Sequence, residues 1–73
     1  MRTPRISIVY NTVEGKELYR LSLNTGKYNL PMGYISPESL HEYIDDYVSL
    51  GYDVFVQYEK DSKYIHVNTN VPY

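Results

Sequence analysis

One segment of this chain has the spacing of a helix, and residues that begin and end helices bound it on both sides. Ser36 suits an N-cap, Pro37 suits the first helical position, and Gly51 can take the left-handed conformation that ends a helix. Between them, large apolar side chains recur on one stripe at helical spacing: Leu40, Tyr43, Ile44, Tyr47, Val48 and Leu50. The sequence therefore predicts one helix over residues 37–50, with Tyr43 and Tyr47 filling the core and their hydroxyls at its rim.

The segments on either side of this helix alternate apolar and polar residues, which is typical of strands. Residues 5–11 and 17–23 are expected to pair through the polar, glycine-containing connection at 12–16. Residues 52–59 and 63–68 are expected to form a second hairpin. Residues 28–30 would add a short strand, whereas the proline and glycine of residues 31–35 indicate a loop. Whether residues 24–35 are strand or loop stays open.

Together these segments predict an α+β fold in one small domain, residues 1–73. We expect a single antiparallel sheet of four strands, or five if residues 28–30 form one, with one helix packed on one face, in the order β-β-(β)-α-β-β. A chain of 73 residues buries only a modest core, and without Cys no disulfide or thiolate metal site supplements it. A homodimer that buries the open sheet face or pairs a strand edge would compensate for the thin core.

Charge and hydropathy exclude several classes of protein. The net charge of −2 argues against a nonspecific nucleic-acid binder, which normally carries a basic stripe. No apolar run approaches the roughly 20 residues that span a bilayer, and residues 1–10 do not have the pattern of a signal peptide. We therefore expect a cytoplasmic location, which is the host cytoplasm if the chain is viral. The abundance of Asn, Tyr, Ile, Lys and Ser favours an AT-rich genome, as is common in phages and mobile elements.

The residues that catalysis or metal binding would need are not brought together by this pattern. There is no Cys, no G-x-S-x-G motif and no glycine-rich phosphate loop. Asp45 and Asp46 are adjacent on the helix and point about 100° apart, so they do not converge. His41 and Asp45 are four residues apart, but zinc needs three or four ligands and the remaining histidine, His66, is expected on the other side of the sheet. We expect no enzyme activity, no metal and no cofactor.

The first candidate binding surface is the acidic face of the predicted helix. It is formed by Glu38, Glu42, Asp45 and Asp46, and residues 28–59 contain neither Lys nor Arg. A segregated negative surface can steer association with a partner protein that has a basic surface. The alternative interpretation is an ordinary solvated helix face.

The second candidate surface is the side of the sheet that the helix leaves open. Val54, Val56, Ile65 and Val67 are expected to face the helix, which places Phe55, Gln57, Tyr64 and His66 on the opposite side with Asn68. An aromatic patch framed by polar groups is typical of a partner-binding or dimer surface. The alternative is that Phe55 and Tyr64 form a cross-strand pair that stabilises a thin sheet.

These observations favour a small non-enzymatic protein-binding module. A phage or mobile-element modulator or inhibitor that occludes a surface of a host factor fits the size and composition best. One alternative is a single-stranded nucleic-acid binder that stacks bases on Phe55, Tyr64 and His66, with Arg5, Arg20 and Lys63 at its margin. The acidic total charge makes nucleic acid the less favoured partner. A further alternative is a structural subunit of a larger assembly.

Overall fold

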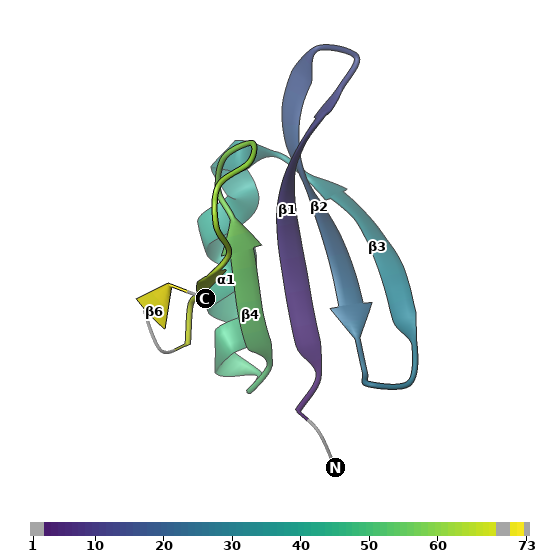
Figure 1. Ribbon diagram of the computed structural model, residues 1–73, viewed down its shortest axis with the longest axis vertical. Coiled ribbons are helices and arrows are strands. Elements are labelled where there is room, and N and C mark those ends of the chain that lie inside the picture. The colour runs from purple at the N-terminus through teal and green to yellow at the C-terminus, as the bar shows by residue number, and fades with distance from the viewer. Residues whose placement is uncertain (1–2, 69–70, 73) are drawn as a thin grey trace.

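The chain folds into one sheet with a single helix on one face, which confirms the predicted α+β class (Figure 1). The computed structural model describes residues 3–68 and 71–72. Within them the sheet order is β3-β2-β1-β4-β5-β6. The elements are β1 (Arg5–Val13), β2 (Lys16–Asn24), β3 (Asn29–Ile35), the 3₁₀ turn η1 (Pro37–Ser39), α1 (Leu40–Ser49), β4 (Asp53–Gln57), β5 (Ile65–His66) and β6 (Val71–Pro72).

The centre of the sheet differs from a purely antiparallel arrangement, because β1 and β4 pair in parallel. The chain runs up β1, down β2 and up β3, and then returns through α1. It therefore enters β4 in the same direction as β1 and takes the free side of that strand. The predicted hairpin of the last two strands is confirmed in a shortened form, since only Ile65 and His66 pair with β4.

The strands β1 and β2 form a long hairpin whose tip extends beyond the rest of the sheet. Their pairing continues to Val13 and Lys16, whereas β4 pairs with β1 only as far as Val9. The hairpin tip is the loop at the top of Figure 1. Glu14 and Gly15 have φ angles of 52° and 78°, which are the positive values of a type I′ turn.

The expected loop at residues 31–35 is instead part of an edge strand, so this prediction was wrong. β3 pairs with β2 from Asn29 to Ile35, with a bulge at Met32 where the register shifts. An edge strand has one side without a neighbour, and it therefore tolerates a proline such as Pro31. Gly33 has a φ of 98°, which a bulged strand can place on glycine without strain.

The helix begins and ends near the predicted residues. Pro37 starts a 3₁₀ turn after Ser36, whose hydroxyl donates to the Ser39 hydroxyl and does not cap the backbone. At the other end the Gly51 N–H donates to the Val48 carbonyl and the Tyr52 N–H donates to the Tyr47 carbonyl. These two bonds form a Schellman motif, and the stacked rings of Tyr47 and Tyr52 add its usual hydrophobic contact.

The core lies between α1 and the two parallel strands. Ile6 and Ile8 of β1 are fully buried beside their register partners Val54 and Val56 of β4. The other buried members are Tyr19, Leu21, Leu40 and Ile44, and Val67 packs against them as expected. Each buried aliphatic side chain is worth about 1.5–3 kcal/mol of transfer free energy. These contacts fix β4 against β1 and so position everything that β4 carries on its other face.

Two tyrosines of the helix stripe have different environments. Tyr47 packs against the core as predicted, whereas Tyr43 is 39% exposed and Leu50 is 68% exposed. At about 100° per residue, Tyr43 and Leu50 lie at the margin of the stripe centred on Leu40 and Ile44. The prediction that Tyr43 fills the core was therefore wrong.

The hydroxyls of the core tyrosines are accommodated at its edge. Tyr19 is 8% exposed, and its hydroxyl donates to the Tyr58 carbonyl at 2.7 Å. Burial raises the pKa of Tyr19, and burial likewise raises the pKa of Tyr47. A tyrosine here provides apolar packing and a polar contact from the same side chain.

Candidate functional site

All four carboxylates of the predicted acidic face lie on the exposed side of the helical segment. Glu38 belongs to η1, while Glu42, Asp45 and Asp46 belong to α1. His41 is also exposed there. We keep the name acidic face for these four carboxylates. Within residues 3–68, no group of three or more His, Asp or Glu side chains could hold a metal ion.

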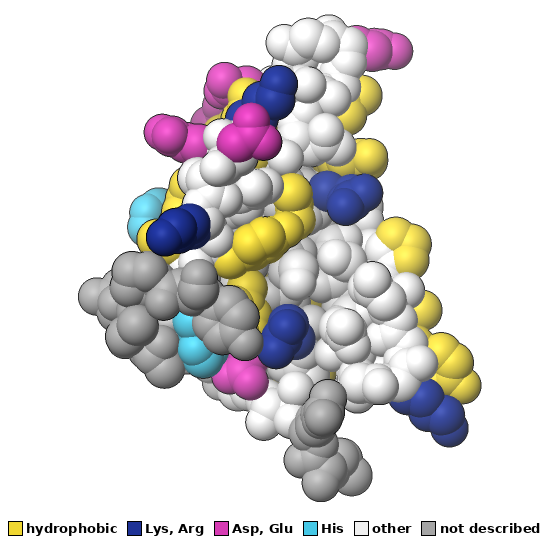
Figure 2. Space-filling model, in the orientation of Figure 1, with side chains coloured by type: hydrophobic (Ala, Val, Ile, Leu, Met, Phe, Trp, Pro, Cys, Tyr) yellow, Lys and Arg dark blue, Asp and Glu magenta, His cyan; other side chains and the backbone are white. Residues whose placement is uncertain are grey.

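The second surface is the face of the sheet that α1 does not cover, which faces the viewer in Figure 1. The pairing of β1 with β4 places Ser7 beside Phe55 and Arg5 beside Asp53. The pairing of β4 with β5 places Phe55 beside His66. In Figure 2 hydrophobic side chains form a strip across the middle of this face, with Lys or Arg side chains on both sides of it. We call the surface formed by Arg5, Ser7, Asp53, Phe55, Gln57, Tyr64 and His66 the sheet face.

Phe55 occupies the centre of the sheet face but is only 5% exposed, so the expectation of an exposed ring was wrong. The imidazole of His66 stacks on the phenyl ring with centroids 4.5 Å apart and planes 9° from parallel. The guanidinium carbon of Arg5 lies 4.4 Å from the same centroid. Phe55 is thus the support on which its neighbours rest, and its register partner is His66 rather than Tyr64.

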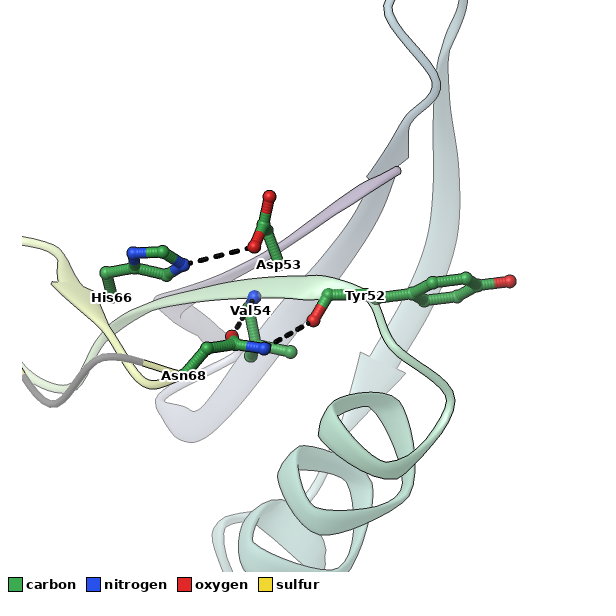
Figure 3. Close-up of polar contacts among 5 residues, drawn as sticks. All are labelled: Tyr52, Asp53, Val54, His66 and Asn68. Carbon is green, nitrogen blue, oxygen red and sulfur yellow. Dashed lines mark hydrogen bonds and ion pairs between the residues drawn. The ribbon is translucent and has the colours of Figure 1, made fainter. Parts of the chain in front are cut away.

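His66 is held from a second direction by Asp53. Its Nε2 lies 3.3 Å from the Asp53 carboxylate, an ion pair when the imidazole is protonated (Figure 3). The next segment is anchored by Asn68, whose side-chain oxygen accepts from the Val54 N–H and whose amide donates to the Tyr52 carbonyl, each at 2.8 Å. These contacts fix the short β5 strand against β4.

Gln57 and Tyr64 complete the predicted set and have different roles. The Gln57 amide donates to the Ser62 carbonyl at 3.0 Å, which braces the turn that precedes Tyr64. Tyr64 is 37% exposed. With Arg5, Ser7 and Phe55 it lines an open hollow of about 160 Å³. The structure therefore brings all four predicted residues to one region, but only Tyr64 exposes a large aromatic surface.

The polar lining of this hollow was only partly predictable. Alternation along residues 5–11 places Arg5 and Ser7 on one face, but nothing in that pattern says which strand lies beside them. The parallel pairing of β1 with β4 brings both residues next to Phe55. Asp53, the partner of His66, was not among the predicted site residues, because its place depends on the same pairing.

The hollow combines a flat cation, two hydroxyls and aromatic walls. A guanidinium that lies over a ring keeps the N–H donors at its edge available for a carboxylate. Within residues 3–68 no ion pair engages Arg5. The hydroxyls of Ser7 and Tyr64 can donate beside it. The site is therefore suited to bind an acidic group that lies next to an apolar one.

Comparison with known protein families, with curated protein sequences and with solved structures finds no match to this chain. Among the described residues, no helix is long and apolar enough to cross a membrane. Function is therefore inferred from the surface chemistry of the chain itself.

Proposed function

We propose that this chain is a non-enzymatic protein-binding module, and that its sheet face is the contact. The partner would present a carboxylate next to an apolar side chain, which would enter the hollow beside Arg5 and Tyr64. Binding would act by covering the partner surface, as expected of a modulator or inhibitor. A phage or mobile-element origin rests on composition alone.

The observation that carries this proposal is the position of Arg5 over Phe55. Stacking at 4.4 Å restrains a long side chain that would otherwise lose rotamer freedom on binding. Arginine and tyrosine are among the residue types that most often dominate the energy of protein interfaces. The hollow puts one of each around an opening of side-chain size.

A single-stranded nucleic-acid binder is the second candidate, and the placement of the arginines favours it. Arg20 is the register partner of Val9, so Arg5 and Arg20 share the open side of the sheet. Stacking, however, needs exposed rings, and the central ring, Phe55, is already covered by Arg5 and His66. We therefore rank this candidate below protein binding.

The proposal is tested by capture of partner proteins from native cell extract, followed by affinity measurement with the purified partner. Arg5→Gln and Tyr64→Ser should each weaken binding by at least about tenfold. Two control variants make the same kinds of change at positions that do not line the hollow. Lys16→Gln removes an exposed cation at the hairpin tip, and Tyr58→Ser removes a ring that is also 37% exposed.

Three outcomes would count against the sheet face as a protein contact. Binding that survives both Arg5→Gln and Tyr64→Ser would exclude the hollow. Loss of binding in a Glu42→Ser/Asp45→Ser/Asp46→Ser variant, with both hollow variants unaffected, would assign the contact to the acidic face. A labelled single strand that binds the chain at low salt, and is released as salt rises, would favour the second candidate.

A further inference from the structure

The edge strand β3 exposes an unusual concentration of apolar side chains. Tyr28, Leu30, Met32 and Tyr34 are 60%, 48%, 46% and 53% exposed. In Figure 2 hydrophobic side chains follow the right-hand margin of the molecule, where Figure 1 shows β3. We call these four residues the β3 patch. The patch wraps around the edge of the sheet, because Leu30 pairs with Leu23 on the helix side and Tyr34 pairs with Arg20 on the open side. Exposed apolar side chains with a polar rim are typical of protein interfaces.

The surroundings of the β3 patch are positively charged. Residues 18–37 include Arg20 and Lys27 but no Asp or Glu. Arg20 is the register partner of Tyr34. The Lys27 Nζ lies 5.8 Å from the Tyr28 ring centroid. A partner for this surface should therefore be both apolar and acidic.

The backbone of β3 is poorly suited to pairing with another strand. Pro31 cannot donate a hydrogen bond, and the bulge at Met32 breaks the regular register. Prolines and bulges are devices that protect sheet edges from strand addition. Contact at this edge is thus expected through side chains rather than through a continued sheet.

The complementary surface is present elsewhere on the same molecule. The acidic face is flanked by the exposed side chains of Tyr43 and Leu50, so it too combines apolar and charged groups. α1 packs against β4, whereas β3 lies at the edge of the sheet beyond β2 and β1 (Figure 1). Glu42, Asp45 and Asp46 of α1 therefore lie on a different part of the molecule from the β3 patch, and a contact between the two surfaces would be made between two chains.

We propose that the β3 patch of one copy docks on the acidic face of a second copy. Arg20 and Lys27 would lie opposite Glu38, Glu42, Asp45 and Asp46, and the apolar side chains would meet between them. Such a contact joins different surfaces of the two copies, so it leads to a ring or an open chain of copies. Pairing of two β3 patches would instead place like charges together.

The size of the surface indicates a weak association. Four large side chains that are about half exposed offer on the order of 400 Å² of apolar area, roughly half of the ~800 Å² that each partner buries in a standard interface. Association should therefore depend on concentration. It should also weaken as salt rises, because the charged groups lie at the rim.

Charge reversal tests the proposal through solution mass, measured by light scattering from about 10 µM to about 1 mM chain. The wild-type mass should rise across this range. Arg20→Glu/Lys27→Glu and Glu42→Lys/Asp46→Lys should each lower the association constant at least about tenfold. An equimolar mixture of the two variants should regain association within about twofold of the wild type, because opposite charges again face each other.

Lys16→Glu is the matched control, since it reverses a charge at the hairpin tip away from both surfaces and should leave the mass unchanged. Circular dichroism of each variant confirms folding. A wild-type chain that stays monomeric throughout would overturn the proposal. So would a Glu42→Lys/Asp46→Lys variant that associates like the wild type, because the contact would then not involve the acidic face.

Discussion

Asn68 shows how one side chain can replace part of a strand. Its amide group satisfies a donor and an acceptor of the β4 region, Val54 N–H and Tyr52 carbonyl, as a paired backbone would. The neighbouring Val67 N–H donates to the Val54 carbonyl in the same place. The last segment is thereby attached to β4 although only Ile65 and His66 pair as a strand.

Asn68→Ala should lower the free energy of unfolding by about 1–2 kcal/mol, because two hydrogen bonds of about 0.5–1.5 kcal/mol each are lost. Asn68→Asp should be less damaging, since a carboxylate still accepts from the Val54 N–H. Urea denaturation measures both variants. An alanine variant as stable as the wild type would show that the side chain does not anchor this segment.

The raised pKa values of the buried tyrosines predict how the free energy of unfolding changes at alkaline pH. Burial raises the pKa of Tyr19 above its ordinary value of 10.0, so the folded chain holds this proton more tightly than the unfolded chain. That contribution to stability is complete below pH 10 and is lost as the pH rises through the raised pKa. The free energy of unfolding should therefore fall above pH 10, and more gently in Tyr19→Phe. Urea denaturation at a series of pH values measures this free energy. If it falls equally steeply with pH in the wild type and in Tyr19→Phe, Tyr19 is not the cause.

At the scale of secondary structure, the turn between β1 and β2 contains a residue in a strained backbone conformation. Glu14 has a φ of 52°, a left-handed conformation that costs most L-residues about 1–2 kcal/mol. Asparagine adopts it more easily, and Asn-Gly is the preferred type I′ sequence.

Glu14→Asn should raise the free energy of unfolding by about 1 kcal/mol. Glu14→Gln is the control, because it removes the charge but keeps the unfavourable backbone conformation. Thermal unfolding of the two variants separates the effects. If both variants stabilise the chain equally, the gain comes from charge and not from the turn.

The elements that could be predicted from the sequence are those with signals in their own residues. Alternation predicted β1 and β2, and Pro37 and Gly51 predicted the ends of the helix within a few residues. The proline and glycine of residues 31–35 indicate a loop because these residues usually end strands, but an edge strand with a bulge accommodates both. Local signals do not say whether a strand has one neighbour or two.

At the scale of the whole molecule, the candidate site depends on which strands lie side by side, and the pattern within one segment does not predict this. The predicted residues Phe55, Gln57, Tyr64 and His66 do lie together, because they share one hairpin and alternate on one side. Their polar neighbours Arg5 and Ser7 join them only because α1 returns the chain to the free side of β1. The depth at which Phe55 is buried depends on that arrangement as well.

The proposed surfaces divide the molecule into separate contacts. The β3 patch and the acidic face would join copies of the chain, and the sheet face would stay free for a different protein. Tyr64 belongs to the sheet face alone, while Arg20 and Lys27 lie beside the β3 patch. Substitution of Tyr64 can therefore separate the two kinds of binding.

The most direct test of this account is the solution mass of Tyr64→Ser beside that of the wild type across one dilution series. Both masses should rise equally above the 8.6 kDa of a single chain, because the sheet face takes no part in self-association. If Tyr64→Ser stays at the mass of one chain while the wild type associates, the sheet face is consumed between copies. It would then not be free for a partner protein, which would contradict the proposed function.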